Sequence, residues 1–296
     1  MQRSVFTLIC FCFLLQANTQ SDTPTLRVIT YNIWNGFDWG KDTTRHQQFL
    51  DWAKFQKPDI FALQELCGYT QEKLAQDAKT WGHDHALILK EDGYPVGLTS
   101  KWPIELVKKQ RDGMWHGMLH ARVAGIDVFV VHLSPADWKT RKREAQIITQ
   151  QIAAISNEKY LVLGDFNALS PMDEDINQEK KALLARYKIG DAKNEKYQNL
   201  RHAYWDYTAM STFFAAGLLD VSMPFLEPTE RFSYPAPALA NIWQTASEIK
   251  RNRQRIDYIL ASPRLAKSCV YSRVLNGPET GQLSDHYPVV ADFVRP

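Results

Sequence analysis

Short apolar runs that each lead into polar or titratable side chains are the feature of this sequence that most constrains its fold. In residues 160–171, YLVLGDFNALSP, the apolar run ends at Gly164, and Asp165 and Asn167 follow one residue apart. Such a run is typical of a buried strand, whose period of two would place both polar side chains on one face at its end. Alternatively, Gly, Asp and Asn form an Asx-type turn after the strand.

The same pattern occurs three more times in the first half of the chain. Asn32 stands at the end of one apolar run, Glu65 follows a second, and His132 follows a third. A carboxylate beside an apolar strand is costly unless it is paired or bound to a metal, which favours a functional role for Glu65. Alternatively, Glu65 begins the next helix and Asn32 is an ordinary turn former.

The last part of the chain adds three more polar residues of this kind. Asp257 lies in an apolar run, and Asp285 and His286 precede the last one. Polar groups that gather at strand ends in a layered α/β fold mark a site. Their spread along the chain predicts one domain, residues 25–296, built around one site.

Periodicity and turn residues predict the elements between these motifs. Helices are expected at residues 43–56, 69–80, 138–155 and 207–217, and strands at residues 26–33, 60–63, 85–89, 95–100, 115–123, 125–132, 160–163, 256–260, 270–274 and 289–293. The polar residues 171–199 predict a mobile insertion with a short helix at 178–187, and residues 225–244 predict a surface loop. Arg143 could reach a phosphate or brace the loop after His132, although such a basic helix is usually a solvated face.

Residues 1–20 differ in composition from the rest of the chain. Arg3 precedes an apolar stretch at residues 5–15, and small and polar residues follow. This pattern predicts a signal peptide and a secreted or periplasmic location, the alternative being an uncleaved membrane anchor; no other segment could span a membrane. In an oxidising compartment Cys67 and Cys269 could pair, or they could be two small buried residues.

Six strings in the chain together carry a family resemblance. They are TYNIW with Asn32, PDIFALQE with Glu65, VHLSP with His132, GDFNALSP with Asp165 and Asn167, RIDYIL with Asp257, and SDHYPVV with Asp285 and His286. In this order they resemble the endonuclease/exonuclease/phosphatase superfamily over residues 26–293. The His-Leu, GDFN and SDHYP strings are more similar to secreted deoxyribonuclease-I-like enzymes and sphingomyelinases than to apurinic endonucleases.

The resemblance implies a fold, an activity and a cofactor. The fold would be a four-layer α/β sandwich with two facing mixed β-sheets. The activity would be hydrolysis of a phosphoester that depends on Mg²⁺ or Mn²⁺. Because Mg²⁺ prefers few carboxylates and keeps several waters, Glu65 with Asn32 and Asp285 fits as its sparse ligand set.

The other motif residues are expected to act on the water and on the phosphoryl group. Asp165 would orient or deprotonate the attacking water, and Asn167 would donate to a phosphoryl oxygen. Asp257 would accept a hydrogen bond from His286 and stabilise its charged form, so that His286 binds a phosphoryl oxygen or shares in activating water. His132 would supply a second cationic contact near the leaving group.

These expectations describe a secreted phosphoesterase, a monomer, whose substrate is a small molecule, a lipid headgroup or a nucleic acid. The net charge of +2 does not favour broad nucleic-acid coating, although the basic residues 250–255 could contact a polyanion near one rim of the site. Specificity would lie in loops 37–41, 112–116 and 225–250, with Trp39, Trp115 and Trp243 as candidate contacts. The alternatives are a nuclease acting on DNA or RNA, and an inactive binding module of the same fold.

Overall fold

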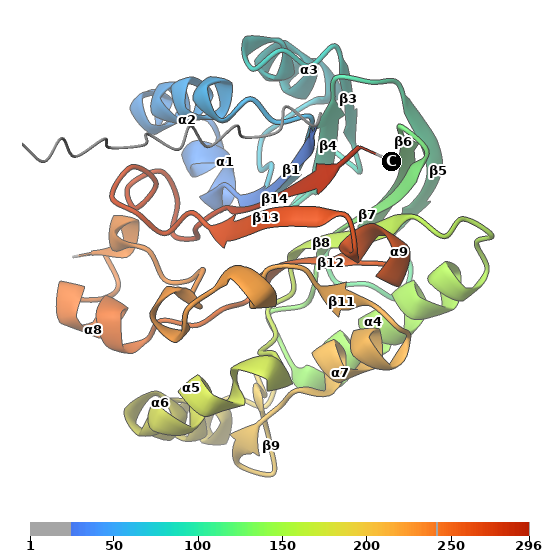
Figure 1. Ribbon diagram of the computed structural model, residues 1–296. Coiled ribbons are helices and arrows are strands. Elements are labelled where there is room, and N and C mark those ends of the chain that lie inside the picture. The colour runs from blue at the N-terminus through green and yellow to red at the C-terminus, as the bar shows by residue number, and fades with distance from the viewer. Residues whose placement is uncertain (1–24, 241, 296) are drawn as a thin grey trace, which may run out of the picture.

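The computed structural model describes residues 25–240 and 242–295, in which two six-stranded sheets face each other and helices cover both outer sides (Figure 1). Both sheets are mixed, with parallel and antiparallel pairs. The expected four-layer α/β sandwich is therefore confirmed. The expected signal peptide at residues 1–20 lies outside the described residues.

The first sheet has the strand order β13-β14-β1-β2-β4-β3. Its strands are β1 (Thr25–Asn32), β2 (Ile60–Gln64), β3 (His85–Ile88), β4 (Gly97–Ser100), β13 (Cys269–Val274) and β14 (Val289–Val294). Each corresponds to a strand predicted from the sequence, because each combines alternation or a short apolar run with flanking turn residues.

The second sheet has the strand order β11-β12-β8-β7-β6-β5. Its strands are β5 (Ile104–Gln110), β6 (Met118–Val123), β7 (Ile126–His132), β8 (Tyr160–Asp165), β11 (Leu219–Asp220) and β12 (Asp257–Ala261), and β9 (Leu200–Arg201) pairs with β10 (Tyr204–Trp205) outside it. The sequence did not predict β5, because this edge strand is mostly exposed and carries Lys108 and Lys109. Such charged edge strands discourage pairing with other chains and lack a clear apolar pattern.

The two sheets share one pairing pattern, and this pattern brings distant polar residues together. A parallel pair, β1 with β2 or β8 with β7, lies beside an antiparallel strand, β14 or β12 respectively. The parallel strands end at the edge where their antiparallel neighbour begins. Asp257 therefore starts its strand, and Asp285 and His286 precede theirs, at the same edge.

Three apolar layers hold the sandwich together. Val28 and Ala62 of the first sheet and Val130 and Leu163 of the second belong to the core between the sheets, and all are fully buried. On the outer sides, α2 (Thr43–Gln56) and α3 (Gln71–Thr80) cover the first sheet, and α4 (Trp138–Ala153) and α7 (Thr208–Ala215) cover the second. These four helices were predicted from the sequence to within two residues at each end.

The segment after β8 is more ordered than the sequence suggested. Instead of one helix at 178–187 it contains η1 (Pro171–Asp173), α5 (Glu174–Glu179) and α6 (Lys181–Lys193). Long-range hydrogen bonds dock it: Trp205 Nε1 donates to the Asn177 carbonyl at 3.1 Å, and Tyr187 Oη donates to Gln254 Oε1 at 3.2 Å. The apolar pattern of this polar segment is weak, so the sequence alone did not show these anchors.

Short elements connect β11 to β12 within the second sheet, and one more follows β12 on the way to the first sheet. They are η2 (Met223–Phe225), η3 (Pro228–Glu230), η4 (Pro237–Leu239), α8 (Ala246–Arg251) and α9 (Pro263–Ala266). The loop expected at 225–244 is therefore a series of single turns, in which a proline occupies the first or second position of η2, η3 and η4.

A left-handed turn, α1 (Trp34–Trp39), follows β1 directly, and all its residues have φ between +50° and +61°. This conformation is unfavourable for most side chains. At Gly36 the backbone packs so closely that a Cβ would lie 2.0 Å from the Cys67 carbonyl oxygen. The buried Arg45 stabilises the turn by donating to the carbonyls of Ile33 and Trp34, each at 3.0 Å.

The two cysteines of the described chain are both free, Cys67 being buried and Cys269 half-buried. The pairing considered from the sequence is therefore not found, and the alternative of a small buried residue holds for Cys67. Among the described residues, no helix combines the length and the apolar character needed to cross a membrane.

Candidate active site

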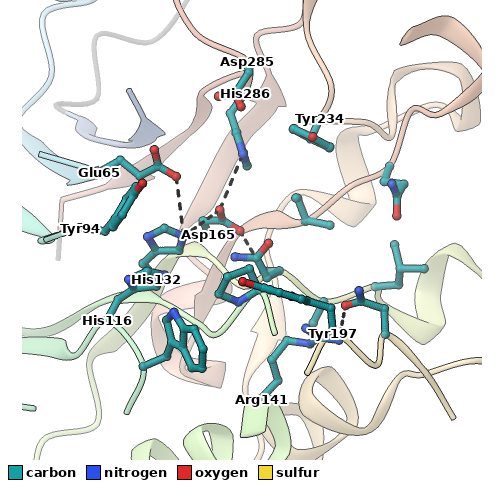
Figure 2. Close-up of a pocket in the computed structure, with 18 of the residues that line it drawn as sticks. Glu65, Tyr94, His116, His132, Arg141, Asp165, Tyr197, Tyr234, Asp285 and His286 are labelled. Carbon is teal, nitrogen blue, oxygen red and sulfur yellow. Dashed lines mark hydrogen bonds and ion pairs between the residues drawn. The ribbon is translucent and has the colours of Figure 1, made fainter. Parts of the chain in front are cut away.

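A pocket of about 560 Å³ opens at the shared strand edge and contains most of the polar residues singled out from the sequence (Figure 2). The predicted residues that line it are Glu65, His132, Asp165, Asn167, Asp285 and His286. Asn32 and Asp257 lie directly behind them and are hydrogen-bonded to Asp165 and His286 respectively. The structure therefore brings together every site residue predicted from the sequence.

Asp165 is at the centre of this cluster. In the second sheet it is in register with His132 on β7 and with Asp257 on β12. Its Oδ2 accepts from Asn32 Nδ2 at 3.1 Å and lies 3.4 Å from His132 Nε2 and 3.7 Å from His286 Nε2. Burial raises the pKa of Asp165 above its ordinary value, although the nearby His286 acts in the opposite direction.

His286 and Asp257 form the pair expected from the sequence. His286 Nδ1 lies 2.9 Å from Asp257 Oδ2, and both side chains are buried. Burial disfavours the charged imidazole, but the negative charges of Asp257, Asp165 and Asp285 outweigh it and raise the pKa of His286 well above its ordinary value. His286 therefore presents Nε2 as a charged donor beside Asp165.

Glu65 and Asp285 place two further carboxylates in the pocket (Figure 2). Glu65 Oε2 accepts from the Asn35 backbone N–H at 2.7 Å, and α3 does not begin until Gln71, so Glu65 does not start the next helix. Burial, together with the negative charge of Glu65, raises the pKa of Asp285 to about 7. Two neighbouring acids in a buried site are the kind of environment that a divalent cation stabilises.

Asn32 is oriented differently from what a metal ligand requires. Its Oδ1 accepts from the Trp34 backbone N–H at 3.0 Å, while its Nδ2 donates to Glu65 and Asp165, each at 3.1 Å. Asn32 therefore offers both amide hydrogens to the two carboxylates, and its Oδ1 is held by the Trp34 N–H. This geometry gives no support to its prediction as a ligand and indicates that it positions Glu65 and Asp165.

A divalent ion has two possible donor sets in this pocket. Asp165, Asp257 and His286 each place one ligand atom within 4.8 Å of the others. However, an ion there would compete with the hydrogen bond between His286 and Asp257, whereas Glu65 and Asp285 offer oxygen donors without that conflict. Because Mg²⁺ and Mn²⁺ prefer oxygen ligands, the second set fits them better.

His132 is neutral in this environment rather than the cation expected from the sequence. Burial lowers its pKa well below the ordinary value, and the neighbouring His116 and His286 lower it further. Its Nδ1 is buried without a hydrogen-bond partner among the described residues, so the proton belongs on Nε2, which faces Asp165. The ring stacks on His116, with the centroids 4.1 Å apart.

Asn167 takes part in an Asx-type turn and also points a donor into the pocket, the two interpretations of the GDFN string given above. Its backbone N–H donates to Asp165 Oδ1 at 2.8 Å, which is the Asx-type turn, and its φ of +46° takes it out of the strand. Its Nδ2 donates one hydrogen to the Leu133 carbonyl at 3.0 Å. An amide nitrogen carries two hydrogens, so one remains for a ligand in the pocket.

Two residues of α4 brace the site and were not predicted. The buried Arg141 donates to the Ser134 carbonyl and to Asn199 Oδ1, each at 3.0 Å, and lines the pocket. The buried Glu144 accepts from the backbone N–H groups of Ser134 and Trp115. Arg143, proposed for this role from the sequence, is exposed, so the brace is Arg141 instead. Arg141 and Glu144 are three residues apart, which places them on the same face of α4, and this spacing could have indicated them from the sequence.

Aromatic side chains form much of the pocket wall, and the sequence indicated only part of this wall. The aromatic lining residues other than histidine are Trp34, Tyr94, Trp115, Tyr187, Tyr197, Trp205, Tyr234 and Trp243. Trp115 and Trp243 were candidates from the sequence. Trp39, the third candidate, is not among the lining residues and instead packs edge-on against Tyr94.

The basic side chains of residues 250–255 do not line this pocket, although Gln254 between them does, so the expected place of these cations at its rim was wrong. Arg255 is buried and bonds Asp173 Oδ2 at 2.8 Å and Asp220 Oδ2 at 2.6 Å. Lys250, Arg251 and Arg253 line a separate pocket. A run of like charges in the sequence therefore divides between a structural ion-pair network and a second surface cavity.

Comparison with known proteins assigns the chain, with its two-sheet sandwich, to a class of nucleases and phosphatases. The model of the endonuclease/exonuclease/phosphatase family matches residues 29–286, and the chain belongs to this family. No curated protein matches the sequence at a significant level.

Solved structures of low sequence identity share the fold. An AP endonuclease from Archaeoglobus fulgidus is 21% identical, with a TM-score of 0.64 over 90% of this chain and 99% of its own. The 3′ phosphatase NExo from Neisseria, bound to a product DNA hairpin, is 21% identical, with a TM-score of 0.65 and the same coverage. TDP2 from D. rerio, complexed with single-strand DNA product, is 16% identical, with a TM-score of 0.61 over 91% of this chain and 98% of its own.

Proposed function

We propose that this protein is a secreted, divalent-metal-dependent phosphoesterase that acts on a small phosphoester. The observation that carries the proposal is the arrangement of Asp165 beside the hydrogen-bonded pair of His286 and Asp257, in one pocket with Glu65 and Asp285. Membership of a family of nucleases and phosphatases supports it. Secretion is proposed from the signal-peptide pattern of residues 1–20.

Glu65 and Asp285 are the residues proposed to hold Mg²⁺ or Mn²⁺. The ion, when bound, would supply positive charge that offsets the charge of the phosphoryl oxygens and stabilises the leaving oxygen. Asn32 would keep Glu65 and Asp165 at a fixed separation through its two donated hydrogen bonds. Asn32 would then position the two carboxylates rather than bind the ion itself.

Asp165 and His286 are proposed to act on water and substrate. Asp165 would orient the attacking water and accept its proton, which the raised pKa of Asp165 favours. The charged His286, held by Asp257, would donate from Nε2 to a phosphoryl oxygen. Asn167 would donate its remaining hydrogen, and the neutral His132 would donate from Nε2.

The size and walls of the pocket support a small substrate. A pocket of about 560 Å³ is in the range that encloses a small molecule, and its tryptophan and tyrosine side chains could stack on a sugar or a ring. The competing function is a nuclease that inserts a single base or strand end between the same side chains. The DNA-bound neighbours NExo and TDP2 motivate this second candidate.

A substrate panel with controlled metal content tests the proposal. The purified protein would be stripped of metal and assayed with Mg²⁺ or Mn²⁺ on phosphomonoesters, small phosphodiesters, lipid headgroup esters, and single- and double-stranded DNA and RNA. We expect turnover of a small ester, loss of that turnover on chelation, and its recovery on adding either ion.

Matched variants make the outcome specific to the site. Glu65→Gln should weaken activation by metal, whereas Glu72→Gln, on α3 outside the pocket, should not. Full turnover after exhaustive metal removal would contradict the metal role. Efficient cleavage of nucleic acid with no turnover of small esters would favour the nuclease instead.

A further inference from the structure

A second cavity of about 450 Å³ lies between α5 and α6 on one side and η3 and α8 on the other. Figure 1 shows α5, α6 and α8 on the same side of the molecule. Its lining contains five cationic side chains and one carboxylate, that of Glu179. The cations are Lys180, Arg231, Lys250, Arg251 and Arg253. This concentration of one charge contrasts with a whole-chain net charge of +2.

Most of these cations have no acidic partner. Arg231 Nη1 lies 3.2 Å from Asp175 Oδ2, whereas the other four form no ion pair within 4.0 Å with any described residue. Cations that converge on a concave surface without counter-ions repel one another and create a positive potential in the cavity. An anion bound there would relieve this repulsion.

Two of the four cations without an ion pair are partly buried rather than free in solvent. Lys180 is half-buried, bonds only the neutral Asn177 Oδ1 at 3.1 Å, and has its pKa lowered to about 8 by burial. The Arg253 Cζ atom lies over the Phe232 ring, 3.9 Å from its centroid, and Arg253 Nε is buried without a hydrogen-bond partner among the described residues. The ring therefore holds the Arg253 guanidinium in place instead of a carboxylate.

The cavity also offers apolar contacts. Phe232 and Leu183 are buried in its lining, and Pro228 and Ile176 add further apolar side chains to it. It is distinct from the catalytic pocket, because no described residue lines both cavities. The two are nevertheless close, since Gln254, the residue after Arg253, lines the catalytic pocket and bonds Tyr187 of α6. The segment 253–254 thus forms part of both linings.

We propose that this second cavity binds a phosphoryl group attached to an apolar moiety, as a site separate from the catalytic pocket. Lys180, Arg253, Lys250 and Arg251 would contact the phosphoryl oxygens, since charge-assisted hydrogen bonds to phosphate are strong. Phe232 and Leu183 would contact the apolar moiety. A soluble phosphorylated compound and a lipid headgroup share this chemistry.

Phenylphosphonate is a suitable probe, because its P–C bond resists hydrolysis at the catalytic site. Its binding would be measured by calorimetry on the full chain, after metal removal with a chelating resin and at low salt. We expect saturable binding that weakens as salt is added. In the variant Lys180→Gln/Arg253→Gln the affinity should fall by about tenfold or more, because two charge-assisted contacts are lost.

The matched control is Lys108→Gln/Lys109→Gln on β5, which removes the same charge outside the cavity. It should bind the probe like the original protein. If Lys180→Gln/Arg253→Gln does not fold, Lys250→Gln/Arg251→Gln, at exposed positions, serves instead. Equal affinity in the cavity variant and the control, or no saturable binding tighter than about 10 mM, would overturn the proposal.

A vesicle arm distinguishes the two sources of the ligand. Sedimentation with phosphatidylcholine vesicles, with and without phosphatidic acid, would be compared for the same variants. Binding that requires phosphatidic acid and is lost in the cavity variant identifies a lipid headgroup, whereas calorimetric binding without vesicle binding identifies a soluble ligand. None of these readouts depends on turnover, so the inference stands or falls independently of the proposed function.

Discussion

Asp165 shows how one residue can be recognised in sequence while its environment is not. The GDFN string identified the carboxylate, and its buried contacts with Asn32, His132 and His286 appeared only in the structure. Those contacts connect strands of both sheets, so its protonation depends on the whole cluster. A substitution at any one of these positions therefore alters the others.

We expect Asp165→Asn and His286→Ala each to reduce kcat by about a thousandfold, with the fold retained. The double variant should lose little more than either single variant, because the two residues act on the same water and phosphoryl group. Steady-state kinetics on the substrate found in the panel would measure this, with circular dichroism as the control for folding. Multiplicative losses, or a single variant with near-full turnover, would contradict the assignment.

His83, away from the pocket, makes folding stability depend on pH. It is fully buried, and its ring lies 2.8 Å from both Thr99 Oγ1 and the Pro58 carbonyl oxygen. Burial lowers its pKa to about 4. Between the unfolded value of about 6.5 and this folded value, the unfolded chain binds the proton and the folded chain does not, so stability is lost as pH falls.

We expect His83 to reduce the free energy of unfolding by about 2 kcal/mol between pH 6.5 and pH 5, at about 1.4 kcal/mol per pH unit. His83→Gln should remove this part of the pH dependence. His202→Gln, the same change at an exposed position, is the control. Denaturant unfolding at the two pH values would measure both, and an unchanged pH dependence in His83→Gln would show that another group is responsible.

At the scale of elements, the segment before β12 shows why a charge run does not define a binding surface. Arg255 bonds acidic residues from η1 and β11, whereas Arg251, at the end of α8, is exposed. The buried guanidinium therefore links the insertion after β8 to the edge of the second sheet. Arg255 is therefore not available to a ligand, whereas Lys250, Arg251 and Arg253 line the second cavity.

We expect Arg255→Gln to lower the free energy of unfolding by about 3–5 kcal/mol, because it leaves two buried carboxylates without their cation. Arg251→Gln should change it by less than about 0.5 kcal/mol, as is usual for an exposed position. Denaturant unfolding of the two variants gives the comparison. Similar stabilities for Arg255→Gln and the original protein would show that the network contributes little.

At the scale of the whole molecule, two sheets with the same pairing pattern meet to form the site. The first sheet contributes Asn32 and Glu65, and the second contributes His132, Asp165 and Asp257. The insertion after β8 and the loops before β12 then add aromatic walls, including Trp205 and Trp243. The framework places the polar cluster, and the added segments limit what can reach it.

We expect Trp243→Ala to raise KM for the small ester by about tenfold, since loss of a stacked ring costs about 1–3 kcal/mol. The side chain is 67% exposed, so the free energy of unfolding should change little. Trp39→Ala is the matched control, because Trp39 is also exposed but does not line the pocket. Equal KM values for the two variants would show that this wall does not contact the substrate.

The sequence by itself predicted most of the strands, the main helices and the polar residues that the pocket brings together, because strand alternation, helical periodicity and turn chemistry act over a few residues. It did not determine which way Asn32 faces, that Arg141 rather than Arg143 braces the loop after His132, or that Arg255 is buried. Those outcomes depend on contacts between residues far apart in the chain, such as Arg255 with Asp173. The hydrogen-bond partners of a side chain and the burial of a charge are fixed only when the layers pack. The orientation of Asn32, the brace by Arg141 and the burial of Arg255 were therefore decided by the tertiary structure alone.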